Sequence, residues 1–255
     1  MLTNSQSQIM PRKYGLIGKT LGHSFSKKYF TEKFGKENVS KSSYDLFELA
    51  TISEFPKLLS RQVDLRGLNV TIPYKQEIIP YLTELSEIAQ RIGAVNVIKL
   101  EKNGGLTGHN SDYFGFMESL LNFIGENRDL KALVLGTGGA SKAVCVALED
   151  LGIEFSTVSR TASKTGFTYS EITSEVVESN QLIINTTPLG MYPNTEEAPQ
   201  LPYSAVSGKH SLFDLVYNPT ETRFMKLGEE SGAKVKNGLE MLHLQAEKAW
   251  EIWNQ

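Results

Sequence analysis

The chain has 255 residues, 40% of them hydrophobic, so it is long enough for two modest domains with ordinary cores. Its 26 basic and 29 acidic residues give a formal net charge of −3, which argues against nucleic acid or an anionic membrane as a partner. No apolar run approaches the roughly 20 residues that span a bilayer, and residues 1–10 lack the apolar segment of a signal peptide. With one cysteine, Cys145, interpreted as a packing residue, we expect a cytoplasmic protein without disulfides.

The first polar motif lies between a strand expected at residues 14–18 and a helix that ends at Gly35. Ser24 and Ser26 stand at the carboxyl end of this strand and the amino end of this helix. Their hydroxyls either cap the helix or bind a substrate carboxylate together with the helix N-terminus. The residues alone leave both interpretations open.

The second motif follows a strand at residues 43–48 and a helix at 53–59. Residues 67–72 predict another strand, in which Asn69 and Thr71 alternate with apolar residues and share one face. Pro73 ends this strand and can open a short helix that carries Lys75 in its first turn. A cation there is mildly disfavoured by the helix dipole, which hints at a function, although solvated lysines are common.

The next elements are an amphipathic helix at residues 84–91, a strand near 93–98, a turn at 103–105 and a helix at 113–123. Four strand-sized runs in this part of the chain end in polar residues, namely Ser24 with Ser26, Asn69 with Thr71, Asn96, and Asp112. This pattern predicts an α/β domain whose strand ends converge on a polar ligand.

A glycine turn then introduces a different kind of domain. Residues 133–135 are apolar, as in a buried parallel strand, and run into Gly136-Thr137-Gly138-Gly139-Ala140-Ser141 and an amphipathic helix closed by Gly152. Gly136 suits the tight turn, Gly138 lets the backbone approach a pyrophosphate, and the small Ser141 permits close helix–strand packing. Strand, turn and helix together indicate a dinucleotide-binding fold.

The second strand of that fold indicates which dinucleotide binds. It covers residues 153–158 and ends in Ser159-Arg160-Thr161. An acidic residue at this strand end would select the ribose of NAD, whereas the Arg160 guanidinium suits the 2′-phosphate of NADP. The alternative is a solvated surface arginine. The position after the strand favours NADP.

From residue 14 to residue 253 the chain resembles the shikimate dehydrogenase family. The matching motifs are His23-Ser24-Phe25-Ser26, residues 69–75, Gly93-Ala94-Val95-Asn96, Asn110-Ser111-Asp112, residues 136–141, residues 185–191, residues 214–219 and residues 238–242 with Gln245. The resemblance implies an α/β fold of two domains with a cleft between them. Residues 1–112 would form the substrate domain, completed by a C-terminal helix at 239–255, and residues 113–238 a Rossmann-like NADP-binding domain with a mostly parallel sheet.

The resemblance also implies the reaction and its residues. NADPH would reduce 3-dehydroshikimate reversibly to shikimate, a step of chorismate and aromatic amino acid biosynthesis. The implied substrate-binding residues are Ser24, Ser26, Asn69, Thr71, Asn96, Tyr217 and Gln245. The implied cofactor-binding residues are Gly136, Thr137, Gly138, Gly139, Ala140, Ser159, Arg160, Thr161, Thr186, Leu215 and Gly238.

Ketone reduction needs a hydride at carbon and a proton at oxygen. We expect Lys75 to supply the proton and stabilise the alkoxide, while Asp112 keeps the lysine charged and oriented. A surface salt bridge is the alternative for this pair. No metal is expected, because the four histidines have no ligand spacing; His23 is interpreted as structural. The partner is then the small-molecule substrate, and the chain a monomer or homodimer.

Two other functions remain open. One is a broader shikimate/quinate dehydrogenase that uses NAD, against which Arg160 argues. The other is a non-catalytic NADP-binding sensor, which would be expected to lose Lys75 or Asp112. The chain also departs from the family pattern: Ser159 stands where asparagine is usual. The segment 161–177 is short and polar, too small for the helix and strand expected there, so that this βα unit is abbreviated.

Overall fold

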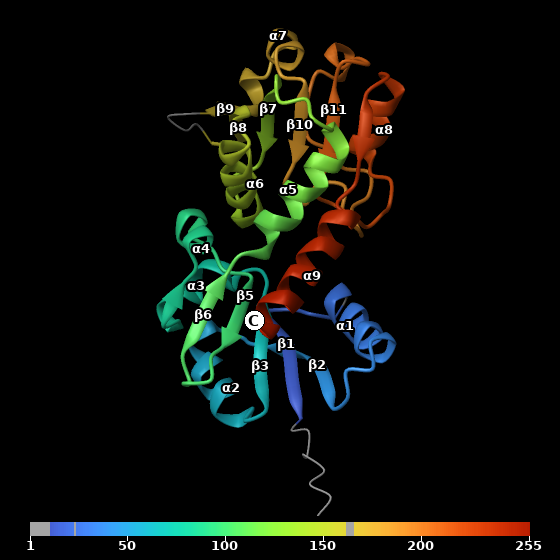
Figure 1. Cartoon of the computed structure of the whole chain (residues 1–255). Coiled ribbons are helices and arrows are strands. Elements are labelled where there is room, and N and C mark those ends of the chain that lie inside the picture. Colours follow the sequence, from blue (N-terminus) through green and yellow to red (C-terminus); the bar gives the residue numbers. More distant parts are fainter. Residues whose placement is uncertain (1–10, 23, 162–165) are drawn as a thin grey trace, which may run out of the picture. The chain divides into compact units, whose positions relative to one another are not determined.

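The computed structural model describes residues 11–22, 24–161 and 166–255, and its chain divides into two compact units (Figure 1). The first unit contains residues 1–110 and Ala249–Gln255, and the second contains Ser111–Lys248. The final helix α9, Leu239–Asn254, therefore contributes residues to both units. Among the described residues, no helix is both long and apolar enough to cross a membrane.

The first unit is built on a six-stranded sheet in the order β2-β1-β3-β5-β6-β4. Its strands are β1 (Arg12–Gly18), β2 (Ser42–Glu48), β3 (Leu65–Val70), β4 (Glu84–Leu85), β5 (Val97–Leu100) and β6 (Leu106–His109). All neighbours are parallel except β5, which runs antiparallel to both β3 and β6. The hairpin that joins β5 and β6 turns at Asn103-Gly104-Gly105, as predicted, with Gly104 at a φ of +86°.

The two faces of this sheet have different cores. Helices α2 (Phe55–Arg61), α3 (Tyr74–Glu77) and α4 (Glu87–Ile92), with short 3₁₀ turns at Ile52–Glu54 and Ile79–Tyr81, pack a mainly aliphatic core against one face. On the other face α1 (Phe25–Lys36) and the end of α9 form an aromatic cluster, whose rings include Tyr14, Phe30, Phe34, Tyr44 and Trp253. The helix at Phe25–Lys36 matches the predicted one.

One predicted helix begins in the wrong place. The sequence predicts a helix over residues 84–91, but Glu84–Leu85 form strand β4 and the helix begins at Glu87. The reason is local, because the Ser86 hydroxyl accepts a hydrogen bond from the Ala89 amide and caps the helix at that point. Gly93, at a φ of +66°, ends it.

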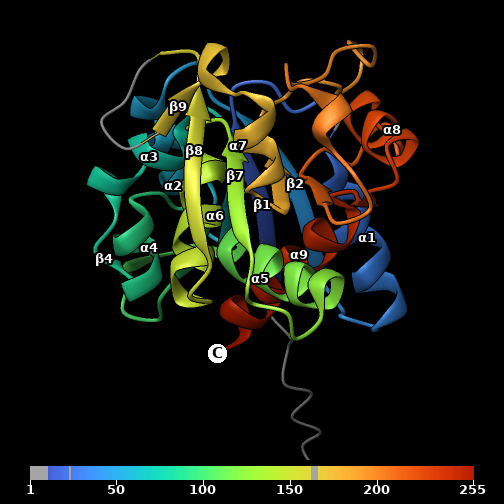
Figure 2. The same cartoon turned by 90° about the horizontal axis from the view of Figure 1, so that it is seen from above.

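The second unit carries a six-stranded, entirely parallel sheet in the order β12-β11-β10-β7-β8-β9. The strands are β7 (Lys131–Leu135), β8 (Glu154–Ser159), β9 (Gly166–Thr168), β10 (Leu182–Asn185), β11 (Ser211–Asp214) and β12 (Lys234–Lys236). Figure 2 shows β8 between β7 and β9 at one side of this sheet. The predicted mostly parallel α/β fold is confirmed.

Alternate residues of the buried strands in the second unit enter two separate cores, as a doubly wound sheet requires. Ala132 and Val134 face a core formed with α5 (Ser111–Ile124), α6 (Gly139–Asp150) and α9. Leu133 and Leu135 face the opposite core, which holds α7 (Ser174–Glu178), α8 (Arg223–Glu230) and a 3₁₀ turn at Tyr203–Ala205. Cys145 packs against the first core, and burial raises the pKa of its thiol, which fits a packing residue.

The segment 161–177 is short, and its βα unit is abbreviated, as the sequence predicts. It contains the three-residue β9, a 3₁₀ turn at Tyr169–Glu171 and the beginning of α7. Side-chain capping makes such short elements feasible. Glu171 accepts hydrogen bonds from the amide and hydroxyl of Thr168, and the Thr173 hydroxyl accepts from the Val176 amide.

Candidate active site

In the first unit, a hydrogen-bond network around one buried tyrosine connects three of the predicted substrate residues, Ser26, Asn69 and Asn96. The Tyr44 hydroxyl donates to Oδ1 of Asn69 at 2.7 Å, and it also has a hydrogen bond with Ser26. Asn69 in turn donates from Nδ2 to the backbone oxygen of Asn96 at 3.2 Å. Burial raises the pKa of Tyr44, so its hydroxyl stays a neutral donor. Tyr44 thus orients Asn69, with one amide hydrogen of that side chain left for a ligand.

Ser24 does not cap helix α1, although it is the N-cap residue by position. Its side chain makes no capping hydrogen bond, and among the described residues its buried Oγ has no hydrogen-bond partner. Ser26 lies in the first turn of α1, where its hydroxyl contacts Tyr44. The capping interpretation therefore does not account for these serines. His23, interpreted as structural, lies outside the described residues.

The segment with Lys75 follows β3, and backbone hydrogen bonds hold it at the carboxyl end of this inner strand. The Thr71 amide donates to Ile17 at 2.9 Å, and the Val95 amide donates to the Lys75 carbonyl at 2.7 Å. Pro73 precedes α3 and Lys75 is the second residue of this helix, as predicted. The Tyr74 hydroxyl anchors the helix by donating to the Leu49 carbonyl at 2.6 Å.

In the second unit, helices α5 and α9 cross. The crossing brings Gln245 of α9 to the first turn of α5, which contains Asp112. The helices touch at Gly115, where a Cβ would lie 2.6 Å from the Met241 carbonyl oxygen and 2.9 Å from the Gln245 nitrogen. Ser111 donates from Oγ to Gln245 Oε1 at 3.4 Å. The α5 helix begins at Ser111, two residues earlier than predicted, so Asp112 belongs to its first turn.

A cavity of about 780 Å³ in the second unit lies at the glycine turn. Six of the predicted cofactor residues line it, namely Gly136, Thr137, Gly138, Ser159, Arg160 and Thr186. Gly139 and Ala140 are the first residues of α6, whose N-cap is Gly138. The helix N-terminus with its free amide groups thus adjoins this cavity, as the binding of a pyrophosphate would require.

The glycines of the turn have separate structural roles. Gly136 has a φ of +107°, and a Cβ there would lie 2.7 Å from Oγ1 of Thr186. The hydroxyls of Ser141 and Thr186 bind the Gly136 and Leu135 carbonyls, at 2.8 Å and 2.7 Å. In contrast, a Cβ at Gly138 would meet nothing within 4 Å, so the space above it is open to a ligand.

Arg160 lines this cavity together with Ser159 and Tyr169. Arg160 is exposed, and no ion pair ties it to another described residue. Ser159 donates its hydroxyl proton to the Thr161 carbonyl, so this proton is not available for a phosphate. Tyr169 lines the same cavity. Burial raises the pKa of its hydroxyl, and the nearby charge of Arg160 lowers that pKa by a smaller amount. Glycine turn, open space and unpaired guanidinium together fit a 2′-phosphorylated dinucleotide.

Leu215 and Gly238 lie together and are not among the residues that line this cavity. A Cβ at Gly238 would be 2.1 Å from the Leu215 carbonyl oxygen, so only glycine fits there, and the Gly238 amide donates to the Val216 carbonyl at 3.1 Å. Tyr217 follows two residues after Leu215, and burial raises the pKa of its hydroxyl. The contact places the loop after β11 against the start of α9.

Two residues with buried polar contacts are not among the predicted site residues, although Asp214 begins the matching motif 214–219. Tyr44 is one; the other is Asp214, the last residue of β11. Its buried carboxylate accepts from Asn185 Nδ2 at 2.9 Å, the Val216 amide at 3.0 Å and the Thr222 hydroxyl at 2.6 Å. Desolvation raises the Asp214 pKa to about 6 despite these bonds. A lone tyrosine or aspartate in a strand is typical of many proteins, so only their contacts identify them.

No group of three His, Cys, Asp or Glu residues in the described part of the chain is arranged to hold a metal ion.

Comparisons with known proteins show which family this chain is similar to. Residues 16–98 match the family described as the shikimate dehydrogenase substrate binding domain. A shikimate dehydrogenase (NADP(+)) of Clostridium beijerinckii is 44% identical over 95% of this chain and 92% of its own. The structure of shikimate 5-dehydrogenase from Thermus thermophilus, in complex with NADP(H) and shikimate, is 30% identical with a TM-score of 0.84, over 95% of this chain and 93% of that one.

A quinate dehydrogenase from Corynebacterium glutamicum, in complex with NAD, has a TM-score of 0.86 at 26% identity, over 95% of this chain and 93% of that one. This neighbour shows that the fold alone does not select the substrate or the dinucleotide. The identity and coverage of the Clostridium beijerinckii relative are nevertheless high enough to assign the family. The chain belongs to the shikimate dehydrogenase family.

Proposed function

We propose that this protein catalyses the reversible, NADP-dependent reduction of 3-dehydroshikimate to shikimate. The observation that carries the proposal is the cavity at the glycine turn, which Arg160 lines with a guanidinium that forms no ion pair with another described residue. The relatives named as NADP-dependent shikimate dehydrogenases support the same reaction. The enzyme would act in the cytoplasm, as a monomer or homodimer.

The residues of the second unit would hold the dinucleotide. Backbone amides of Gly138, Gly139 and Ala140 would bind the pyrophosphate at the start of α6. Arg160 would pair with the adenosine 2′-phosphate, because a guanidinium and a phosphate form charge-assisted, bidentate hydrogen bonds. Thr161 and the loops at Thr186, Leu215 and Gly238 would contact the remainder of the cofactor. When bound, NADPH supplies the hydride that reduces the carbonyl carbon.

The substrate would be recognised mostly by neutral hydrogen-bonding groups. Ser24 and Ser26 would bind the carboxylate with the N-terminus of α1, since the Ser24 hydroxyl is not used for capping. The hydroxyl groups of the substrate would bind to the residues that the resemblance assigns to them, namely Asn69, Thr71, Asn96, Tyr217 and Gln245. Many neutral donors and acceptors suit a polyhydroxylated acid.

Lys75 would carry the proton. In reduction its ammonium donates a proton to the carbonyl oxygen as the carbon receives hydride, so that an alcohol forms and a neutral amine remains. In oxidation the neutral amine accepts the hydroxyl proton while hydride leaves the carbon. Asp112 would keep the lysine charged and oriented, because an opposite charge favours the ammonium form.

Turnover with four combinations of purified substrates tests this function. We expect rapid reduction of NADP with shikimate and a much smaller kcat/KM for NADP with quinate or for NAD with either acid. Comparable values for NAD would instead support the broader shikimate/quinate dehydrogenase, to which the quinate dehydrogenase neighbour is a precedent. Binding of NADP without turnover of either acid would indicate the non-catalytic sensor.

A further inference from the structure

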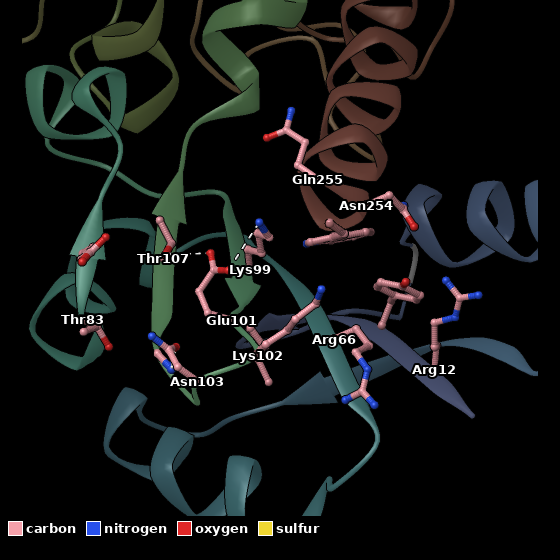
Figure 3. A pocket seen from close by; sticks show the side chains of 15 residues that line it. Arg12, Arg66, Thr83, Lys99, Glu101, Lys102, Asn103, Thr107, Asn254 and Gln255 are labelled. Atoms are coloured by element: carbon pink, nitrogen blue, oxygen red, sulfur yellow. Dashed lines mark hydrogen bonds and ion pairs between the residues drawn. The ribbon is translucent and has the colours of Figure 1, made fainter. Parts of the chain in front are cut away.

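The sheet of the first unit has a groove on the face that carries the aromatic cluster. The groove has a volume of about 780 Å³, within the usual range for a small-molecule site (Figure 3). It begins at Tyr14 and Trp253 and extends over β3, β5 and β6 toward Glu84 on β4. The residues assigned to substrate or cofactor above do not line it.

Strand register explains how the groove forms. Tyr14 pairs with Gly67, Gly67 with Lys99, and Lys99 with Thr107, so these four residues share one face across four strands. Trp253 covers only part of this row of four residues, the part that includes Gly67. A Cβ at Gly67 would lie 2.2 Å from the indole ring, so glycine is required beneath it. Past this ring, the side chains of Lys99 and Thr107 line the groove.

A β-bulge adds a second guanidinium at the covered end. Lys13 pairs with Leu65 and Tyr14 with Gly67, so Arg66 is the extra residue on β3. Bulges re-aim side chains and are common beside binding sites. Arg66 lines the groove together with Arg12 of β1. The charges of both arginines lower the pKa of the Tyr14 hydroxyl, although burial raises it overall, so both guanidiniums act on this one group.

The cations of the groove are unequally paired. Glu101 is occupied, because it lies 3.4 Å from Lys99 Nζ and accepts from the Thr107 hydroxyl at 3.0 Å (Figure 3). Arg12, Arg66 and Lys102 form no ion pair with any carboxylate of the described residues. Residues 1–10, 23 and 162–165 contain no Asp or Glu that could provide one. Like charges on neighbouring strands are destabilising. In a chain of net charge −3, this concentration of cations calls for a ligand.

We propose that this groove binds an elongated small-molecule polyanion with two or more phosphate or carboxylate groups. The three cations come from β1, from β3 and from the turn after β5, and adjacent strands lie about 4.8 Å apart, so their backbones span about 10 Å. An elongated ligand with two or more anionic groups can contact all three without drawing these like charges together onto one oxyanion. Guanidinium groups favour planar, bidentate contacts with both anion types. Glu84, at the other end of the groove, disfavours a further negative charge there, so the anionic groups lie over β1, β3 and β5.

Calorimetric titration of the full chain with tripolyphosphate at low salt tests the proposal, with citrate as a second probe. The double variant Arg12→Gln/Arg66→Gln should bind tripolyphosphate at least about tenfold more weakly, because two charge-assisted contacts are lost. The matched control is Lys36→Gln/Lys57→Gln, which removes the same charge from exposed positions of the first unit outside the groove. Stronger binding of citrate would identify the ligand as a polycarboxylate, and stronger binding of tripolyphosphate as a polyphosphate.

The cofactor cavity is a competing site for tripolyphosphate. The variant Arg160→Gln should therefore retain the groove's affinity, whereas loss of binding in that variant would overturn the proposal. It is also overturned if the groove variant and its control bind equally, or if neither probe binds. Should the double variant not fold, the single variant Lys102→Gln, at an exposed residue of the turn after β5, should still weaken binding about threefold or more. None of these outcomes depends on dehydrogenase turnover.

Discussion

The hydroxyl of Tyr44 donates a hydrogen bond to Oδ1 of Asn69 at 2.7 Å, and both side chains are buried. Two strands, β2 and β3, thereby fix the orientation of an amide that the substrate would meet. Replacing this tyrosine by phenylalanine would leave a buried oxygen without its donor.

We expect Tyr44→Phe to destabilise the protein by about 1–3 kcal/mol, the usual penalty for an unsatisfied buried polar group. Because Asn69 loses its orientation, the KM for shikimate should rise severalfold, with a smaller effect on the KM for NADP. Chemical denaturation and steady-state kinetics measure the two effects. Tyr81→Phe, which removes the hydroxyl of a half-buried tyrosine in the same unit, is the control. An unchanged KM for shikimate would show that Tyr44 serves stability alone.

The serines before and within α1 allow capping and binding to be separated. Replacing an N-cap serine by alanine normally costs about 0.5–2 kcal/mol. Ser24 makes no capping hydrogen bond, so Ser24→Ala should lose less than that range, while Ser24→Ala/Ser26→Ala should raise the KM for shikimate. Ser86→Ala is the matched control, since Ser86 does cap α4. It should lose stability without a change in KM. The reverse pattern would assign the α1 serines to capping.

Lys75 should act mainly on the chemical step. An interaction that is stronger in the transition state than in the ground state raises kcat, and general acid–base catalysis contributes about 10²–10⁴-fold. Lys75→Ala should therefore lower kcat at least about 100-fold, with a much smaller change in shikimate affinity. Asp112→Asn should also lower kcat, because the lysine loses a charged partner. Lys57→Ala, at an exposed lysine of α2, should have no effect. Near-normal kcat in Lys75→Ala, with only KM raised, would make this lysine a binding residue.

Arg160 should determine the choice of dinucleotide. A charge-assisted contact to the 2′-phosphate corresponds to about tenfold to hundredfold in affinity. Arg160→Ala should therefore reduce the ratio of kcat/KM for NADP to that for NAD by about this factor, mostly through the NADP term. The exposed Arg61 of α2 provides a control substitution to alanine. If the unmutated enzyme used NAD and NADP equally well, the role of Arg160 would be refuted directly.

Asp214 should make stability depend on pH in an unusual direction. Its pKa is raised from the model-compound value of 3.8 to about 6, chiefly by desolvation, so the folded state retains a proton that the unfolded chain has already lost. The contribution of Asp214 is therefore fully present below pH 4 and decreases as the pH rises to 6, by up to about 3 kcal/mol. The difference in unfolding free energy between the unmutated protein and Asp214→Asn, measured from pH 4 to pH 7, isolates this effect. A difference that does not vary with pH would contradict it.

The sequence by itself determined most local structure and the type of each domain. The strand at β7, the turn at Gly136 and the helix α6 follow from apolar periodicity and from the backbone freedom of glycine, both of which act over a few residues. The predicted start of α4 was wrong by three residues. A short amphipathic pattern gives less information about where a helix begins than the N-cap hydrogen bond of Ser86 does. In the abbreviated unit after β8, side-chain capping by Thr168 and Thr173 supports elements of only a few residues, whose bounds the sequence did not predict.

Only tertiary structure decided which distant residues meet. Tyr44 of β2 reaches Asn69 of β3 because only one strand, β1, separates these two strands in the sheet. Gln245 reaches the start of α5 because Gly115 lets α5 and α9 touch. Such contacts depend on the packing of elements far apart in the chain, which leaves no periodic pattern in the sequence. The same holds for Arg66, the extra residue of a bulge in β3, which lines the groove together with Arg12. Residue type thus predicts the chemistry that is available, while strand order and helix crossings decide which groups act together.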